Sequence, residues 1–167
     1  LTRKVKYTYD ANGKVIKEER QSNAAATTWQ TTQYTYGANN HLTSIKDPLN
    51  LTTAFTYDAN ENQITKRDPK ANTTSYLYDE RDLLFKGTDA NLGVTQYNYT
   101  PNGMLASVID AKNNKTQYLY DGFDRKTRTT YPDTSVFEQY TYDKNSNVTS
   151  QITPNNQTIT YTYDALN

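Results

Sequence analysis

A short motif, Tyr-x-Tyr-Asp, returns eight times along the chain and constrains its fold more than any other feature. The second tyrosine of the motif stands at positions 9, 36, 57, 78, 99, 120, 142 and 163, in steps of 27, 21, 21, 21, 21, 22 and 21 residues. Fifteen of the 16 tyrosines belong to these copies, and only Tyr131 lies outside them. A fixed period of this length is typical of repeat architectures, in which each repeat is one supersecondary unit. We therefore predict a single repeat array over residues 1–167.

The motif positions are predicted to be structural positions of the repeat. Each has an aromatic ring at the first or third residue of the motif, or an aspartate at the fourth. The predicted structural repeat residues are Tyr7, Tyr9, Asp10, Tyr34, Tyr36, Phe55, Tyr57, Asp58, Tyr76, Tyr78, Asp79, Tyr97, Tyr99, Tyr118, Tyr120, Asp121, Tyr140, Tyr142, Asp143, Tyr161, Tyr163 and Asp164.

Each repeat is predicted to be strand, turn, strand, turn. Thr53, Phe55 and Tyr57 stand at every second position and so share one face, which is the period of a strand. Asp and Gly or Asn follow the motif at turn spacing, as in 10–13, and a second turn begins with Asp-Pro, as in 47–50. Between the two turns the apolar residues Leu42 and Ile45 are three apart, which indicates a β-bulge in the second strand.

Such repeats in series predict an all-β fold, because short turns join neighbouring antiparallel strands into a meander. Eight motifs imply roughly sixteen strands in one sheet. Sheets twist, and open sheets of more than about ten strands curl or split, so we expect a curved or spiralling sheet.

Composition limits both the core and the partners. Leu, Ile, Val and Phe together are 27 of 167 residues, so the tyrosines must supply most of the apolar surface, and we expect most of them to be buried. Eighteen basic and 18 acidic residues balance, which argues against nucleic acid and anionic membranes as partners. There is no apolar run of membrane-spanning length and no cysteine, so neither a membrane span nor a thiolate metal site is expected.

Two irregularities stand at the first repeat and at the end of the chain. The first step is six residues longer, with the excess near 21–26 and the only tryptophan, Trp29, close by. This segment is either a longer hairpin or a special contact. The chain ends midway through a turn at 163–167, so we expect a fragment of a longer array, cut at both ends.

Tyr-x-Tyr-Asp, Asp-x-x-Gly and Asp-Pro at this spacing resemble the YD-repeat (Rhs-repeat) family, over essentially the whole chain. That family includes bacterial Rhs and wall-associated toxins, components of insecticidal Tc toxins, and animal teneurins. The resemblance implies a β-ribbon that spirals into a hollow shell, which in the toxins encloses a C-terminal toxic domain. The family's self-cleaving aspartate core lies downstream of the repeats, and nothing in this chain matches it. Gly37 and Thr100 in the Asp place and Phe55 in the first Tyr place depart from the pattern and are interpreted as drift.

Sites of other kinds were considered and are not expected. The segments starting at Asp58 and Asp143 begin like calcium-binding loops but lack the glycine and the terminal glutamate, so they are interpreted as turns. His41 is the only histidine, which excludes a catalytic triad, and we expect it to be solvated. The acids recur at turns instead of gathering in a cleft, so no enzyme, metal site or cofactor is predicted. The Asn-x-Ser/Thr sequons at Asn50, Asn72, Asn98, Asn114, Asn147 and Asn156 are attributed to chance in an Asn- and Thr-rich chain.

The sequence thus predicts a non-catalytic wall segment of a large bacterial polypeptide that is secreted or delivered to the cell surface. Its partners would be the rest of that polypeptide, with further repeats and an enclosed toxin domain, and other sheet edges through self-association. The competing hypothesis is an adhesive module that binds carbohydrate through exposed Tyr, Asn and Asp side chains.

Overall fold

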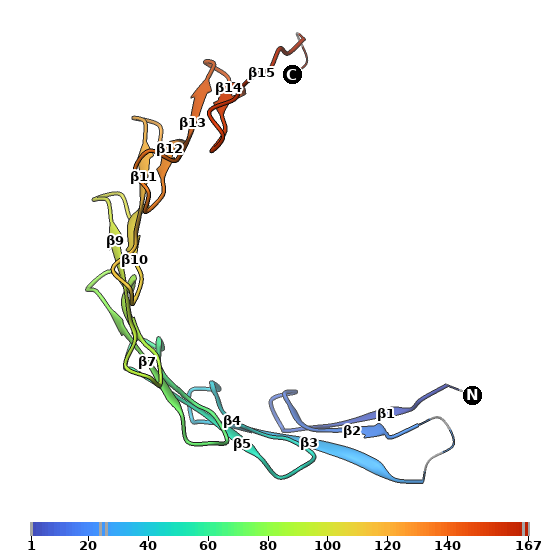
Figure 1. Cartoon of the computed structure of the whole chain (residues 1–167). Helices are drawn as coiled ribbons and strands as arrows, with labels where there is room; N and C mark the ends of the chain where they lie inside the picture. Colours follow the sequence, from blue (N-terminus) through green and yellow to red (C-terminus); the bar gives the residue numbers. More distant parts are fainter. Residues whose placement is uncertain (1, 24, 26, 165, 167) are drawn as a thin grey trace. The chain divides into compact units, whose positions relative to one another are not determined.

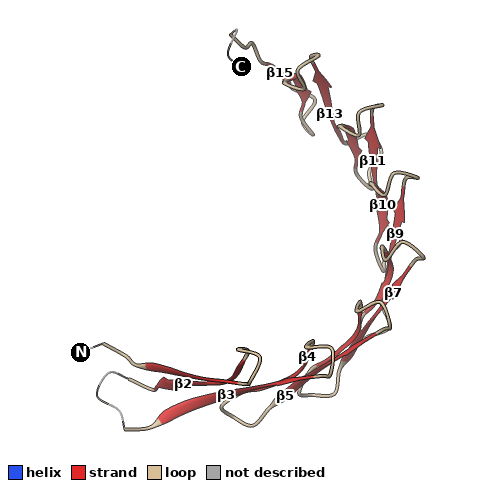
Figure 2. Cartoon of the chain, turned by 180° about the vertical axis from the view of Figure 1, so that it is seen from behind, coloured by secondary structure: helices blue, strands red, loops and turns tan. Residues whose placement is uncertain are grey.

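The computed structural model describes residues 2–23, 25, 27–164 and 166, and every element in that part of the chain is a β-strand or a turn. No helix occurs among these residues (Figure 2). The strands are β1 (Val5–Tyr9), β2 (Val15–Gln21), β3 (Trp29–Tyr36), β4 (Leu42–Lys46), β5 (Thr52–Tyr57), β6 (Gln63–Arg67), β7 (Thr73–Tyr78), β8 (Leu84–Thr88), β9 (Val94–Tyr99), β10 (Leu105–Ile109), β11 (Lys115–Tyr120), β12 (Lys126–Thr130), β13 (Phe137–Tyr142), β14 (Val148–Ile152) and β15 (Thr158–Thr160) (Figure 1).

The strand order in the sheet is the order of the chain, from β1 to β15. The predicted all-β antiparallel meander is therefore confirmed, with fifteen strands in the described residues where roughly sixteen were expected. The odd-numbered strands from β1 to β13 end in the Tyr-x-Tyr motif, β15 ends directly before its copy, and the even-numbered strands follow the turn after the motif. Nothing in the described part of the chain is a helix that could span a membrane.

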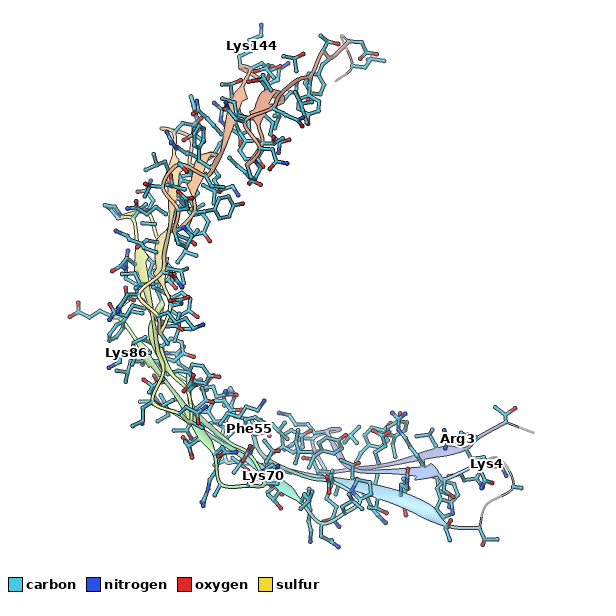
Figure 3. The ribbon with its side chains drawn as sticks, in the orientation of Figure 1. Arg3, Lys4, Phe55, Lys70, Lys86 and Lys144 are labelled. Carbon is cyan, nitrogen blue, oxygen red and sulfur yellow. The ribbon has the colours of Figure 1, made fainter. Side chains whose placement is uncertain are left out.

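Two compact units make up the chain, and each is considered by itself. One unit comprises Leu1–Tyr78 with Thr88–Asn91, and the other comprises Asp79–Gly87 with Leu92–Asn167. Within each unit the strands form one layer, and side chains project from both of its faces without a second layer of strands or helices over them (Figure 3). Each repeat can therefore pack only against the repeats beside it.

A β-bulge interrupts the motif hairpins at the same place wherever their register is described. Thr35 lies opposite Ser44 and Tyr36 lies opposite Leu42, so Thr43 has no partner across the ladder. An extra residue of this kind bends its strand and explains why Leu42 and Ile45 are three apart. The predicted bulge is thus confirmed. In the hairpins whose register is described, the extra residues are Ile16, Thr43, Ile64, Ala106, Thr127 and Thr149.

Most of the turns follow one backbone scheme at both ends of the strands, and the longer turn 131–136 departs from it. In the turn 58–61 the Asp58 amide donates to the Asn62 carbonyl, and the Glu61 amide donates back to the Asp58 carbonyl. The fourth residue of such a turn has positive φ, a conformation that favours Gly or Asn. The sequence predicts this for Gly13, yet Glu61 (φ 73°), Ala71 (φ 68°) and Leu92 (φ 66°) adopt it too. The turn hydrogen bonds hold these residues in the left-handed region in spite of their side chains.

The long first repeat is a longer hairpin. β2 and β3 pair at five positions, out to Gln21 opposite Trp29, whereas the corresponding strands β4 and β5 pair at three. Trp29 also makes a contact, because the Lys6 ammonium lies 4.0 Å from the centre of its ring. The segment is therefore both a longer hairpin and the site of a specific contact of Trp29. Ala24 and Ala26 lie outside the described residues.

The expectation of a buried tyrosine core is wrong. Among the described residues no hydrophobic side chain is fully buried, and the most buried residues are Ser107 and Thr129, at 5% and 4% exposure. The motif tyrosines from Tyr34 to Tyr142 are half-buried. A single layer explains this, since neighbouring side chains flank each ring but nothing covers it. On the opposite face the residues between the tyrosines are exposed, as Leu77 and Leu119 show.

Candidate functional site

The two tyrosines of each motif lie on one face of the sheet, because side chains two residues apart in a strand point the same way. The second tyrosine makes the same hydrogen bond in each of seven copies, and we call these seven residues the tyrosine ladder. Each hydroxyl donates to a backbone carbonyl of the preceding repeat: Tyr36 to Val15 (3.1 Å), Tyr57 to Leu42 (2.9 Å), Tyr78 to Gln63 (3.0 Å), Tyr99 to Leu84 (2.8 Å), Tyr120 to Leu105 (2.9 Å), Tyr142 to Lys126 (2.7 Å) and Tyr163 to Val148 (2.8 Å).

The accepting residue is always the first residue of an even-numbered strand. Between β4 and β5 the backbone ladder covers only the three pairs next to the connecting turn, from Lys46–Thr52 to Ser44–Ala54. At the far end of this strand pair, Tyr57 reaches Leu42 through its hydroxyl instead. A side-chain hydrogen bond thus continues the connection between repeats where backbone pairing has stopped.

Burial around the ladder affects its titration. Removal from water raises the pKa of the hydroxyls of Tyr78, Tyr99 and Tyr120, since it disfavours the anionic form. The neutral hydroxyl, which can donate, is therefore the favoured form in the folded chain.

The first tyrosine of the motif has no common partner. Tyr34 donates to the Glu18 carboxylate (3.4 Å), Tyr140 to Glu138 (3.3 Å) and Tyr161 to the Gln151 side chain (3.2 Å). Because no fixed backbone acceptor depends on this hydroxyl, phenylalanine can stand in its place, as Phe55 does. Tyr131, the tyrosine outside the motifs, has a raised pKa through burial and the nearby Glu138 carboxylate.

The aspartates predicted as turn residues act as acceptors for backbone amides. Asp58 Oδ1 accepts from the amides of Asn60 and Asn62, both at 2.9 Å, and Oδ2 accepts from the Asn62 side chain at 3.2 Å. Asp143 makes the same three bonds with Asn145 and Asn147. N–H donors surround these carboxylates, which is an environment for a turn and not for calcium. No group of three or more potential metal ligands occurs in the part of the chain that the structure describes.

Two classes of turn share this arrangement. Motif turns follow the odd-numbered strands, and return turns follow the even-numbered strands. In the return turn 110–113, the Asn114 side chain and the amides of Asn114 and Lys112 donate to Asp110 and lower the pKa of its carboxyl. In the motif turn 121–124, Arg125 does the same for Asp121.

Successive motif turns also contact one another through side chains. In the first unit Lys14 donates to the Asn40 carbonyl, and His41 Nε2 lies 3.1 Å from Glu61 Oε2. In the second unit Arg81 donates to the Thr100 carbonyl (3.1 Å), Asn102 to Asp124 (3.0 Å) and Arg125 to the Asp143 carbonyl (3.0 Å). These contacts join neighbouring repeats at the end of the strands where the tyrosine ladder lies.

Three of these linking side chains stand at the position directly after the left-handed turn residue. Lys14 lies over the Tyr36 ring at 4.9 Å, Arg125 lies over the Tyr142 ring at 4.6 Å, and the His41 ring lies 4.9 Å from the Tyr57 ring. The expected solvated histidine is therefore wrong, since His41 is half-buried and paired. This position is not among the predicted structural repeat residues, although its fixed place after each motif turn is a signal in the sequence that identifies it.

Two family models match the sequence. A model described as Teneurin YD-shell matches residues 2–133, more than half of the chain, and one described as RHS Repeat matches residues 142–167. A search of curated proteins gave no match.

Solved structures with a similar fold include two of Tc toxin components. A crystal structure of TcdB2-TccC3-Cdc42 matches with a TM-score of 0.71 and 16% identity, over 88% of this chain and 9% of that one. A Photorhabdus luminescens Tc holotoxin pore with a TccC3 mutation matches with a TM-score of 0.72 and 17% identity, over 93% and 9%. The chain thus spans about a tenth of the length of these polypeptides, and at these identities the likeness is one of fold.

Proposed function

Because the chain belongs to the teneurin YD-shell family, we propose that it is a non-catalytic wall segment of a larger polypeptide. In this role it forms part of a β-shell that encloses or presents another domain. The parent polypeptide would be a secreted or surface-delivered bacterial protein of the toxin-like kind, with further repeats and an enclosed toxin domain as partners of this segment.

The tyrosine ladder is the observation that carries this proposal. Each ladder hydroxyl connects one repeat to the repeat before it, as Tyr99 does with Leu84. An architecture joined only between neighbours can be extended by adding repeats. The second tyrosines of the motif thus join neighbouring repeats, and the motif aspartates, such as Asp58 and Asp143, form hydrogen bonds within their own turns. Such a use of side chains suits a wall.

The enclosing role itself is supported by the family and by the single layer of strands in each unit. The similar structures are of TcdB2-TccC3-Cdc42 and of a Tc holotoxin pore with a mutation in TccC3. A single layer becomes a container only with many more repeats than eight, so the proposal requires further repeats in the parent polypeptide.

Carbohydrate binding by the ladder is the less favoured function. A sugar-binding tyrosine needs an accessible ring face or a hydroxyl free to bond, whereas the ladder hydroxyls donate to backbone carbonyls over 2.7–3.1 Å. Any adhesive role would have to use the half-buried ring faces or other groups of the chain.

Protease protection in the parent polypeptide tests the proposal. We expect the enclosed domain to resist digestion until the wall is weakened by the triple change Tyr78→Phe, Tyr99→Phe and Tyr120→Phe. The matched control changes the first motif tyrosines, Tyr76, Tyr97 and Tyr118, to phenylalanine and should leave protection unchanged. Equal digestion of the enclosed domain in the unmodified protein and in the triple variant would contradict the proposal, as would a parent without further repeats.

A further inference from the structure

Two departures from the motif in the first unit, Gly37 and Phe55, lie at one surface concavity. It has a volume of about 380 Å³, and its lining includes Gly37, which occupies the Asp place, and Phe55, which occupies the first Tyr place. The lining also includes His41, the only histidine of the chain. Figure 3 shows where Phe55 lies in the ribbon. These three residues, which come from two successive repeats, therefore meet at one place.

Aromatic rings and carboxylates form much of this concavity. Phe55, Tyr57 and His41 supply three rings, and the His41 and Tyr57 rings are 4.9 Å apart. Asp58 and Glu61 supply two carboxylates, and neither Lys nor Arg is among the described lining residues. An anionic ligand would be repelled by this lining, whereas a cation is attracted both by the carboxylates and by the ring faces.

Glycine at position 37 avoids one close contact in the lining of the concavity. A Cβ atom at Gly37 would lie 3.3 Å from the Thr43 methyl group, which also lines the concavity. A larger residue at this position would require Thr43 to shift by a few tenths of an ångström.

The same place in two other repeats already holds a cation. Lys14 lies over the Tyr36 ring and Arg125 over the Tyr142 ring, each directly after the left-handed turn residue. His41 occupies this position in its repeat, but imidazole is shorter than either side chain and carries a full charge only when protonated. The geometry of the repeat therefore accommodates a cation against the second tyrosine, while this repeat supplies no permanent one.

We infer that the concavity binds an organic ammonium group from outside the chain. The group lies against Phe55 and Tyr57, with its charge compensated by Glu61, in the region that Lys14 and Arg125 fill in their own repeats.

Titration of the full chain with choline, followed by amide chemical shifts, tests this inference. We expect saturable shifts confined to residues 37–43 and 55–61, with half-saturation on the order of 1 mM. The variant His41→Arg supplies the missing cation, as Arg125 does, and should weaken choline binding at least about tenfold while its amide spectrum stays that of a folded chain. Glu61→Gln should also weaken binding, and Glu80→Gln, in the next motif turn, should not.

Four outcomes would overturn the inference. These are the absence of saturable shifts with choline, choline binding that His41→Arg leaves unchanged, equal binding of the neutral isostere with a tert-butyl group in place of trimethylammonium, and preferential binding of methyl glucoside. The third outcome would make the concavity a purely apolar site, and the fourth would make it a saccharide site.

Discussion

The two ends of the strands connect neighbouring repeats by different means. At the return turns, backbone pairs such as Lys46–Thr52 join one repeat to the next, and the hydrogen bonds of Asp47, Asp68 and Asp110 remain within their own turns. At the motif turns, side chains make the connection, through the tyrosine ladder and through contacts from one turn to the next. Backbone pairing places few demands on sequence, whereas the side-chain connection requires particular residues at particular positions.

The side-chain connection itself has an invariant part and a variable part. All eight copies carry tyrosine as the third residue of the motif, and the ladder bond requires its hydroxyl. The contacts between turns are made by Lys14, His41, Arg81, Asn102 and Arg125, which differ in type and in exact partner. The difference indicates that the ladder sets the spacing of repeats and that the turn contacts reinforce it.

Alkaline pH should have the largest effect, because it acts on three ladder hydroxyls at once. The folded-state pKa of Tyr78, Tyr99 and Tyr120 is raised above the usual value of about 10. A raised folded pKa contributes stability that is present below the unfolded pKa and is lost as pH rises through the folded value. We expect cooperative unfolding above about pH 10, with amide exchange beginning at the motif-turn end. Circular dichroism and tyrosinate absorbance should change together, and tyrosinate formation in a chain that keeps its strand spectrum would contradict this.

Truncation of a ladder tyrosine should have the next largest effect. Tyr99→Ala removes a half-buried ring and its bond to Leu84, and we expect a loss of about 2–3 kcal/mol of unfolding free energy, below the about 3–5 kcal/mol for a fully buried aromatic. Leu119→Ala, on the opposite and exposed face, should cost less than about 0.5 kcal/mol. Urea denaturation of both variants measures the difference, and equal costs would mean that the two faces do not differ.

Removal of single hydroxyls separates the two tyrosines of a motif. Tyr99→Phe deletes the donor to the Leu84 carbonyl and should cost about 1 kcal/mol. Tyr97→Phe, two residues earlier on the same face, should be close to neutral, as the natural Phe55 suggests. Both variants keep their rings, so their urea midpoints compare the hydroxyls alone. A larger cost at Tyr97 would remove the basis for the ladder.

The smallest effect concerns the return turns. Ala71 has a φ of 68°, a conformation that costs a non-glycine residue about 1 kcal/mol or more. Ala71→Gly should therefore stabilise the chain by up to about 1 kcal/mol, net of the greater freedom of glycine in the unfolded state. Ala59→Gly, in the motif turn 58–61, is the matched control at a residue outside the positive-φ set and should give no gain. Thermal melts measure both, and a gain at Ala59 equal to that at Ala71 would show that the strain is not the cause.

The fold could be predicted from sequence because the same pattern of strand and turn residues recurs eight times. The repeat period and the turn residues were enough to predict the meander, and the three-residue spacing of Leu42 and Ile45 was enough to predict its bulge. The degree of burial could not be predicted, because amphipathic alternation shows which face is apolar but not whether anything covers it. The partner of Tyr57 also could not be predicted, since it depends on where backbone pairing between β4 and β5 stops. The burial and pairing of His41 could not be predicted, because its partner, Glu61, belongs to the next repeat.

Because the ladder bond always ends at the first residue of an even-numbered strand, the array tolerates repeats of different lengths. The hydroxyl and its acceptor are 15 residues apart in five copies, 16 at Tyr142 and 21 at Tyr36, yet the acceptor is the first residue of an even-numbered strand each time. The extra residues are absorbed in the segment after the even-numbered strand, at 131–136 and in the hairpin that contains Trp29. Insertions in return turns can therefore accumulate during the evolution of such a wall without changing its internal spacing. These turns are accordingly the places where a loop with a new recognition sequence can be grafted.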